Sequence, residues 1–214
     1  MTDSLETTRK DYQRSHLVFN QLPSDPSDLL IQWLEDAQGC DPEDYNAMVL
    51  STRSMEGGSN SRIVLLRAFE EGSIRFFTNY DSTKGREITA CPNVSCLFFW
   101  PKLERQVRIK GRAKLSEAEI SNRYFESRPR SSQIGAWASK QSQEGTEGEL
   151  ESRIATLTEK FANEAISRPT FWGGFDIEPH EYEFWQGRPS RLHQRYCYRW
   201  SQSARAWTTQ RIDP

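Results

Sequence analysis

The sequence predicts a mainly β protein of the α+β class: an antiparallel barrel with helices packed on its outside. Two observations favour this fold, namely seven or more strand-like segments and few helical segments between them. A doubly wound parallel sheet is disfavoured, because it needs a helix after nearly every strand. A third observation, 12% aromatic residues with seven Trp, argues against disorder, and 214 residues are enough to bury a core.

Composition and charge narrow the function classes. The formal net charge is −2, with basic and acidic residues interspersed, so no global field steers the protein to nucleic acid. The N-terminus lacks an apolar signal region, and no stretch approaches the roughly 20 apolar residues of a membrane span. Cys40, Cys91, Cys96 and Cys197 form no CxxC pair and no zinc-type cluster. We expect a cytoplasmic protein with free thiols, no metal, no membrane and no nucleic-acid partner.

The first half of the chain alternates short strands with two helices. Residues 1–20 are polar and expected to be mobile without ligand, and 21–214 are expected to form a single domain. The first helix follows Asp25 and Pro26, which suit the cap and the first helical position, and Gly39 is its expected stop. Strands are expected at 47–52, 61–69, 73–79 and 94–100, turns at 57–58 and 70–72, and a helix at 83–90.

The second half contains the cleanest alternation, from Gln106 to Leu115, which predicts a half-buried strand. Its apolar face is Val107, Ile109, Ala113 and Leu115. The run Ser116-Glu117-Ala118-Glu119 predicts a capping box that opens a helix to about Ser127, ended by Arg128-Pro129. Further helices are expected at about 133–138 and 150–163, a polar loop at 140–149, and strands at 172–177, 182–185, 192–200 and 206–212.

The most informative stretch is EFWQGRPSRLHQR, from Glu183 to Arg195. Arg191, His193 and Arg195 are spaced two apart, so on an extended strand all three side chains would point to one face. Three potentially cationic groups on one face repel unless something anionic lies against them. The pattern indicates a site for a phosphate, a carboxylate or an electron-rich ring. A solvated edge strand is the simpler interpretation of the same alternation.

This stretch and five further blocks, in the same order, resemble the pyridoxamine 5'-phosphate oxidase family from about Arg9 to Pro214. The blocks are RIVLLR (62–67), FFTNYDSTKGRE (76–87), LERQV (103–107), YFESRPRSSQIGAWASKQS (124–142) and FWGGF (171–175). The resemblance implies an FMN-binding split barrel and a homodimer with FMN at the interface. A dimerisation and substrate segment would span about 171–214. A symmetric dimer also suits a barrel this small, which encloses little pocket.

The resemblance implies a set of FMN-binding residues. Arg62 and Lys84 would bind the FMN phosphate, and a helix N-terminus bearing a Lys suits phosphate on physical grounds. A buried Arg that opens an apolar strand would need an anionic partner. The other implied contacts are Ile63, Val64, Leu65, Leu66, Arg67, Phe77, Thr78, Thr83, Gln106, Trp185 and Arg195, with Gln141 and Ser142 from the partner subunit. Phe77 and Trp185 would otherwise be ordinary core aromatics.

The resemblance also implies a clamp for a substrate phosphate. Tyr124, Arg128 and Ser132 match it at four-residue spacing, which places the first two on one helix face. The break at Pro129 would let Ser132 turn inward. Arg67 completes the implied clamp.

The C-terminal signature supplies the implied catalytic residues. Arg191 would hold the substrate over the flavin and stabilise developing charge. His193 would orient the ring hydroxyl or assist proton transfer, and otherwise it is a strand His satisfied by a neighbour. Leu192 would contact the substrate beside them, and Arg9 and Tyr12 resemble residues of an N-terminal lid.

Three positions depart from the family pattern. The Lys that usually ends RIVLL is Arg67, which replaces a point charge with a planar fork. The first of two basic residues that open the short helix is Thr83, which removes one implied phosphate contact, and Arg86 is a partial substitute. The acid that usually follows RLH is Gln194, and we expect its loss to loosen Arg195.

The implied activity is FMN-dependent oxidation of pyridoxamine 5'-phosphate and pyridoxine 5'-phosphate by O2 to pyridoxal 5'-phosphate, in vitamin B6 metabolism. A hydride would pass to flavin N5, hydrogen peroxide would be released, and the protein would orient and polarise the substrate. Two alternatives stay open: a flavin oxidase of another ring, as in phenazine biosynthesis, and a non-catalytic flavin- or vitamer-binding split barrel. Nucleic-acid binding through Arg108, Lys110, Arg112 and Lys114 is disfavoured, because no aromatics stack among them.

Overall fold

The computed structural model describes residues 11–13 and 15–214. Its strands are β1 (Ala47–Arg53), β2 (Ser59–Leu65), β3 (Ala68–Glu70), β4 (Ser73–Asn79), β5 (Asn93–Trp100), β6 (Arg105–Leu115), β7 (Trp172–Gln186), β8 (Gln194–Ser201) and β9 (Ala206–Ile212). Its α-helices are α2 (Pro26–Cys40), α3 (Thr83–Ala90), α4 (Ala118–Ser127), α5 (Arg130–Ala138) and α6 (Glu149–Lys160). Two 3-10 helices are η1 (Phe19–Gln21) and η2 (Pro189–Arg191).

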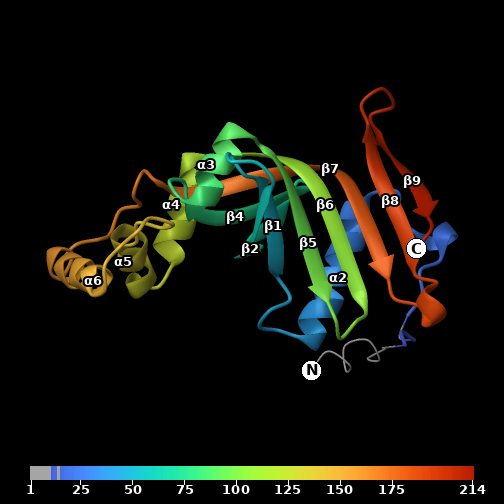
Figure 1. Cartoon of the computed structure of the whole chain (residues 1–214), viewed down its shortest axis with the longest axis horizontal. Helices are drawn as coiled ribbons and strands as arrows, with labels where there is room; N and C mark the ends of the chain where they lie inside the picture. The colour runs from blue at the N-terminus through green and yellow to red at the C-terminus, as the bar shows by residue number, and fades with distance from the viewer. Residues whose placement is uncertain (1–10, 14) are drawn as a thin grey trace. The chain divides into compact units, whose positions relative to one another are not determined.

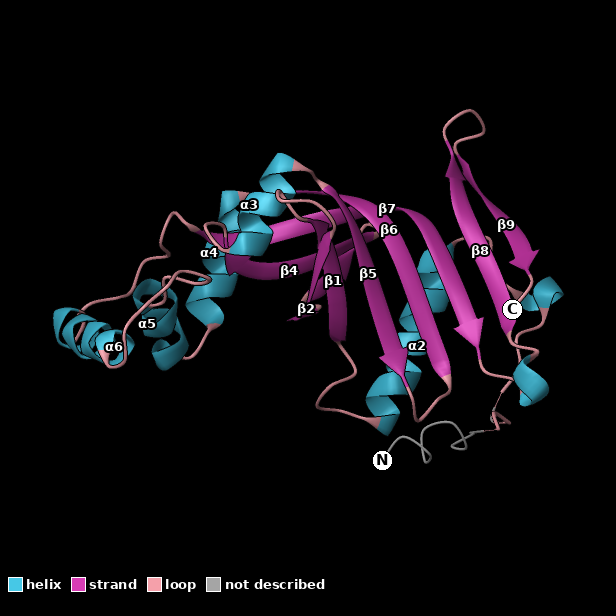
Figure 2. Cartoon of the chain, viewed as in Figure 1, coloured by secondary structure: helices cyan, strands magenta, loops and turns pink. Residues whose placement is uncertain are grey.

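The nine strands form one sheet, in the order β2-β1-β5-β6-β7-β4-β3, with β8 paired to β7 and β9 paired to β8 (Figures 1 and 2). The pairings of β3 with β4, β4 with β7, β7 with β8 and β8 with β9 are antiparallel. A mainly antiparallel sheet with peripheral helices confirms the predicted fold class. Among the helices that the structure describes, none combines the length and apolar character needed to cross a membrane.

The chain divides into two compact units. The first unit contains the described part of 1–49, with 96–110 and 180–214. The second unit contains 50–95 and 111–179. The prediction of a single domain over 21–214 stays a prediction.

The first unit has its core between α2 and the C-terminal strands. Asp25 caps α2 by accepting a hydrogen bond from Ser27 N at 2.8 Å, with Pro26 at the first turn, as predicted. Trp33, 1% exposed, packs edge-on against Phe184 at 5.2 Å between ring centroids. The expected stop at Gly39 was wrong by one residue, because α2 continues to Cys40.

Residues 11–13 and 15–21 belong to this first unit and make contacts within it. Gln13 N donates to Glu104 Oε2 at 2.9 Å, and Arg188 Nη1 donates to Ser15 O at 2.8 Å. Tyr12 packs on Gly187, where an added Cβ would lie 2.7 Å from the Tyr12 ring. The prediction that the N-terminal segment is mobile without ligand is not tested by these contacts.

The second unit has a core beneath α4, α5 and α6. Its buried cluster is Phe125, Ile134, Ala136, Phe161, Ile166 and Trp172. Figure 1 shows α5 and α6 side by side, and their residues are in contact. These helices begin and end within a few residues of the expected positions, because amphipathic periodicity is a local signal.

Two strand predictions were wrong because strands change partners. The predicted strand 61–69 is split into β2, which neighbours β1, and β3, which pairs with β4. The predicted strands 172–177 and 182–185 are one strand, β7. Pro179 lies between Ile177, where the pairing with β4 ends, and Glu181, where the pairing with β8 begins. The missing N–H of Pro179 therefore costs neither ladder a hydrogen bond.

The predicted capping box at Ser116 was also wrong. The N-cap of α4 is Glu117, without a side-chain cap. Ser116 is buried, its N donates to Gly174 O at 2.9 Å, and its hydroxyl has no hydrogen-bond partner. Because Ser116 packs against β7, its side chain does not cap α4. Leu115 is 59% exposed, so the predicted apolar face of β6 ends before it.

Candidate functional site

A cavity of about 510 Å³ lies in the second unit, a volume typical of small-ligand sites. Its lining comes from β2, β4, α3, the junction of α4 and α5, the segment after α5, and β7. The lining residues that the sequence predicted are Ile63, Val64, Leu65, Arg67, Phe77, Thr78, Lys84, Tyr124, Arg128, Ser132 and Gln141. The sequence did not predict three further lining residues, Ser127, Pro129 and Trp172. Trp172 lies within the block FWGGF, which was a usable signal.

Among the residues that the structure describes, the cavity is lined by three cations, Arg67, Lys84 and Arg128, and by no carboxylate. Within the part of the chain that the structure describes, none of the three forms an ion pair with Asp or Glu. Like charges this close repel each other until an anion lies among them. The cavity is therefore electrostatically suited to an anionic ligand.

Lys84 is the most buried of these cations, at 8% exposure. Its Nζ donates to the hydroxyls of Thr78 at 3.1 Å and Ser82 at 3.3 Å. Burial, and then the charge of Arg62, lower the pKa of Lys84 to about 8. Lys84 lies in the first turn of α3, so its ammonium and the helix N–H groups together offer an anion site.

The start of α3 depends on two small residues. Ser82 caps the helix by accepting from Gly85 N at 3.3 Å. A Cβ added to Gly85 would lie 2.1 Å from Tyr80 O, so only glycine allows this close approach. Thr83 opens the helix as expected but does not line the cavity.

Arg128 lies at the break between α4 and α5. Its Nη1 is buried and has no hydrogen-bond partner within residues 11–13 and 15–214, and its guanidinium lies 4.6 Å from the ring centroid of Trp172. Burial lowers the pKa of Arg128, and the nearby charge of Arg67 lowers it further. Because α4 ends at Ser127 and α5 begins after Pro129, the break brings Ser132 to the same cavity as Arg128.

Aromatic rings form one wall of the cavity. Phe77 stacks on Tyr124 with centroids 3.8 Å apart and an interplanar angle of 13°. Trp172 lies parallel to Phe77 at 5.7 Å. Phe77 comes from β4 and Trp172 from its neighbour β7, so sheet pairing sets this stack. A flat aromatic ligand can pack against such rings.

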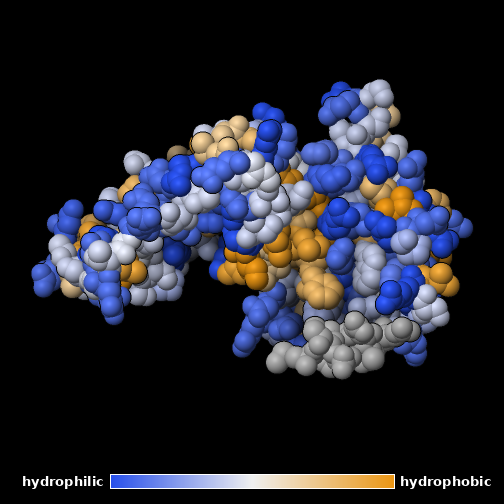
Figure 3. Space-filling view, in the orientation of Figure 1, coloured by the Kyte–Doolittle hydropathy of each residue, from blue (hydrophilic) through white to orange (hydrophobic). Residues whose placement is uncertain are grey.

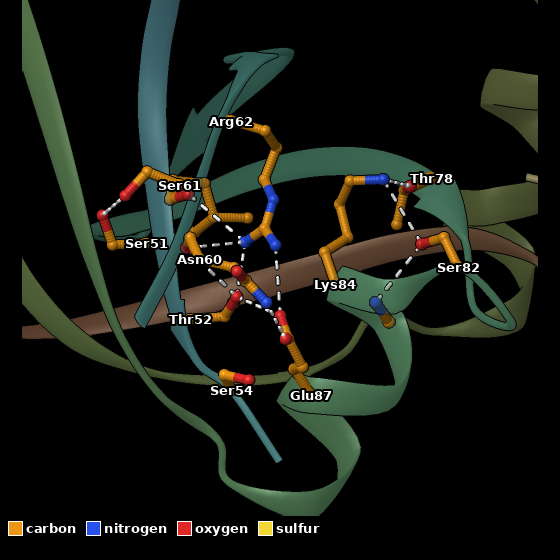
Figure 4. Close-up of polar contacts among 12 residues, drawn as sticks. Ser51, Thr52, Ser54, Asn60, Ser61, Arg62, Thr78, Ser82, Lys84 and Glu87 are labelled. Carbon is orange, nitrogen blue, oxygen red and sulfur yellow. Dashed lines mark hydrogen bonds and ion pairs between the residues drawn. The ribbon is translucent and has the colours of Figure 1, made fainter. Parts of the chain in front are cut away.

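Arg62 does not line the cavity, and its anionic partner is internal. Its Nη2 donates to Glu87 Oε2 at 3.1 Å, and its Nη1 donates to Thr52 Oγ1 (Figure 4). The expectation that a buried Arg at this position needs an anionic partner is confirmed, because Glu87 is that partner. The implied contact of Arg62 with the FMN phosphate stays a prediction. Sequence reasoning missed Glu87, although its place one turn after Lys84 was a usable signal.

Two further predicted FMN contacts in the second unit lie outside the lining. Leu66 is 7% exposed and Ser142 is exposed with φ of 67°. Gln141 accepts a hydrogen bond from Thr78 Oγ1 of its own chain at 3.3 Å. The implied reach of Gln141 and Ser142 to the cofactor of a partner subunit stays a prediction.

A second group of predicted residues lies in the first unit. The ring centroids of Trp185 and His193 are 4.6 Å apart, and Tyr12 lies 5.6 Å from each. His193 Nδ1 accepts from Arg188 N at 3.1 Å, so the neutral imidazole carries its proton on Nε2. Burial, and then the charge of Arg191, lower the pKa of His193.

The predicted common strand face of Arg191, His193 and Arg195 was wrong. Strand β8 begins at Gln194, so only Arg195 belongs to it. Arg191 ends η2 with a left-handed φ of 61°, and His193 lies in the irregular segment between η2 and β8. Arg191 is exposed, and Leu192 is 70% exposed. The two-residue alternation therefore does not apply here, because it requires extended backbone.

Arg195 is not loosened by the presence of Gln194. Its Nε and Nη2 contact Glu183 Oε1 at 3.0 and 2.9 Å, and its Nη1 donates to Asp213 O at 2.9 Å. Gln194 instead binds the backbone of Leu17, through Leu17 N and Leu17 O, both at 2.7 Å. Glu183 thus restrains Arg195, as an acid at position 194 was expected to do.

The remaining predicted residues in the first unit are less informative. Gln106 is half-buried on β6. Arg9, the other predicted lid residue beside Tyr12, lies outside the described residues.

Two family models match most of the chain. Residues 38–160 match the family model described as pyridoxamine 5'-phosphate oxidase, and residues 172–214 match the pyridoxine 5'-phosphate oxidase C-terminal dimerisation region. Curated proteins named pyridoxine/pyridoxamine 5'-phosphate oxidase are similar over their whole length. Those of Pseudomonas paraeruginosa and Ectopseudomonas mendocina are each 44% identical, with both chains fully covered.

Solved structures show the same fold. PhzG from Burkholderia lata, in complex with tetrahydrophenazine-1-carboxylic acid, superposes with a TM-score of 0.86 at 29% identity, covering 94% of this chain and 100% of that one. A pyridoxamine 5'-phosphate oxidase-related, FMN-binding protein from Nostoc punctiforme has a TM-score of 0.70 at 15% identity, covering 87% and 96%. These likenesses confirm the predicted split barrel. With the two family matches and the full-length relatives, they show that the chain belongs to the pyridoxamine 5'-phosphate oxidase family.

Proposed function

We propose that this protein binds FMN and oxidises pyridoxamine 5'-phosphate and pyridoxine 5'-phosphate to pyridoxal 5'-phosphate. The observation that carries the proposal is the cavity of the second unit, whose described lining has three cations, no carboxylate and a wall of stacked rings. A phosphorylated aromatic ligand would neutralise the cations and cover the rings. The names of the full-length relatives support the same substrates.

The residues present fit the phosphate of FMN. Lys84 is buried with only hydroxyl partners, and the first turn of α3 adds backbone N–H groups. Arg62 adds a second positive charge close enough to lower the pKa of Lys84. When bound, FMN would supply the two-electron acceptor for the reaction. Thr78 would hold the Lys84 ammonium in place, because its hydroxyl accepts from Nζ.

A second phosphate would be held by the residues at the break between α4 and α5. Arg128 Nη1 is buried without a partner, and a substrate phosphate would satisfy it. Arg67 would add charge, and the hydroxyls of Tyr124 and Ser132 would add hydrogen bonds. These four residues would select phosphorylated vitamers over the free vitamers.

The proposed catalytic residues are Arg191 and His193 of the first unit. Arg191 is exposed and has no carboxylate partner among the described residues, so its guanidinium is available to the substrate ring. His193 has Nδ1 occupied by Arg188 N–H, so Nε2 would hold or move a proton at the substrate. The lowered pKa of His193 favours the neutral imidazole that such a role requires.

A homodimer is supported by the match of residues 172–214 to the dimerisation region. Large apolar side chains on β2 and β5 are exposed, including Ile63 at 69% and Phe99 at 56%. Figure 3 shows apolar surface over β1 and β5. Such surface suits burial by a second copy of the chain. The proposed interfacial position of FMN would complete the site in this dimer.

The test is oxygen-dependent formation of pyridoxal 5'-phosphate from pyridoxine 5'-phosphate by purified protein with added FMN. Turnover that requires FMN, and that is lost with unphosphorylated pyridoxine, is the expected result. Bound FMN without any turnover would overturn the proposed oxidase and leave a binding protein.

The likeness to PhzG supports a second candidate function, that of a flavin oxidase acting on a phenazine precursor. The same assay with a tetrahydrophenazine carboxylic acid distinguishes the two. The three cations of the cavity favour the phosphorylated vitamer, because a phosphate monoester carries nearly two negative charges and a carboxylate only one. Faster turnover of the phenazine substrate would reverse this preference.

A further inference from the structure

We infer that Glu87 is a positioning residue for the phosphate end of the cofactor: it holds the Arg62 guanidinium so that its free N–H groups are set for the phosphate. The inference rests on the proposed FMN binding and concerns a residue that does not itself line the cavity.

The carboxylate of Glu87 is saturated by protein donors. Its side chain is 3% exposed. Thr52 Oγ1 donates to Oε2 at 2.5 Å, Asn60 Nδ2 donates to Oε1, and Arg62 Nη2 donates to Oε2 at 3.1 Å (Figure 4). Burial alone would raise the pKa of Glu87, but these three hydrogen bonds outweigh it and lower the pKa. Glu87 is therefore an ionised anchor around neutral pH.

This anchor connects three elements of the second unit. Glu87 lies on α3, Thr52 on β1, and Asn60 and Arg62 on β2. The helix that carries Lys84 is thus tied to the strand that carries Arg62. One carboxylate sets the relative positions of the two cations proposed for the phosphate.

Arg62 is restrained on one side and open on the other. Its Nη1 donates to Thr52 Oγ1, to Asn60 O at 3.2 Å and to Leu50 O at 3.4 Å, while Nη2 binds Glu87. Its Nε–H has no partner among the residues described, and its side chain is 20% exposed. A guanidinium has five N–H donors, so Arg62 can keep its internal contacts and still bind an anion.

A phosphate would not displace Glu87 from Arg62. Displacement would break the Arg62 contact while leaving Glu87 buried with only Thr52 and Asn60 as donors, and a buried charge that loses its partner is costly. The geometry therefore indicates that Glu87 holds Arg62 in place for the phosphate and does not compete with the phosphate for Arg62. Fixing a flexible Arg before the ligand arrives reduces the entropy that binding must overcome.

The test compares Glu87→Asp with wild type, because Asp keeps the charge but is one methylene too short to reach all three donors. Dissociation constants are measured for FMN and for riboflavin, which lacks the phosphate, by quenching of flavin fluorescence. The ratio of the riboflavin constant to the FMN constant isolates the phosphate contribution. We expect Glu87→Asp to weaken FMN about tenfold and riboflavin less than threefold, which lowers the ratio.

Two further variants control for misfolding of Glu87→Asp and for a non-specific loss of stability. Thr52→Val removes one donor to Glu87 and one acceptor for Arg62 Nη1 at similar volume. It loosens the same network and should lower the ratio by a smaller factor, even if Glu87→Asp fails to fold. Asp176→Asn breaks the Arg75–Asp176 pair, which has similar burial in the same unit but does not line the cavity. This matched control should cost stability and leave the ratio unchanged.

The outcomes separate the inference from the proposed function. Equal weakening of FMN and riboflavin would give Glu87 a structural role only and overturn the inference. A ratio that rises would also overturn it, because Glu87 would then oppose the phosphate. A wild-type protein without preference for FMN over riboflavin would instead refute FMN phosphate binding itself.

Discussion

The proposed contact of Lys84 with the FMN phosphate predicts that the affinity for FMN depends on pH. In the ligand-free protein, burial and the charge of Arg62 lower the pKa of Lys84 to about 8. A bound phosphate favours the ammonium, so it raises that pKa. Binding above pH 8 must therefore take up a proton. The affinity for FMN should fall as the pH rises through this range.

The magnitude follows from the pKa. One unit above it, at pH 9, about one Lys84 in eleven carries the charge that the phosphate needs. The dissociation constant should therefore rise about tenfold between pH 7 and pH 9, equivalent to roughly 1.4 kcal/mol. The second ionisation of a phosphate monoester lies near pH 6, so it does not contribute above pH 7.

Titrations that follow flavin fluorescence at several pH values between 7 and 9.5 measure this slope. Lys84→Arg provides the matched control, because Arg stays charged over the whole range and should give a flat profile. Riboflavin should also bind with a flat profile, since it has no phosphate. A constant affinity for FMN over this range, or the same slope in Lys84→Arg, would refute the reasoning.

Three further predictions concern other parts of the site. Arg128→Ala should raise KM for pyridoxine 5'-phosphate about 10- to 100-fold in steady-state assays and leave the FMN dissociation constant unchanged. Arg191→Ala should lower kcat about 100-fold or more with FMN binding within twofold of wild type, and equal losses of both would contradict its role. Gly85→Ala should lower the free energy of unfolding by about 1–3 kcal/mol in urea titrations, because its Cβ would overlap Tyr80 O.

Local patterns predicted most of the elements. The cap and first turn of α2 and the alternation of β6 depend on neighbouring residues, so they are visible in the sequence. The errors came where distant contacts override a local signal. Ser116 has the sequence of a cap but is packed against Gly174, and Arg191 has strand-like spacing but lies in η2.

The sequence predicted most of the residues that line the candidate site, but not which acid pairs with which arginine. The resemblance assigned Lys84 to the FMN phosphate and Tyr124 and Arg128 to the substrate phosphate, and the structure brings all three to one cavity. It did not reveal that Glu87 partners Arg62, or that Glu183 partners Arg195. Both acids are visible in the sequence, but neither has a local pattern that assigns its partner.

The amino-acid sequence alone predicted the fold class, the family and the kinds of side chain that line the cavity of the second unit. Contacts between distant residues show which cations already pair with a carboxylate, as Arg62 does with Glu87, and which do not. The physical reason is that ion pairs and hydrogen bonds need approach to about 3 Å in a specific orientation. Strand register and helix docking set that approach, and these depend on contacts between residues far apart in the chain.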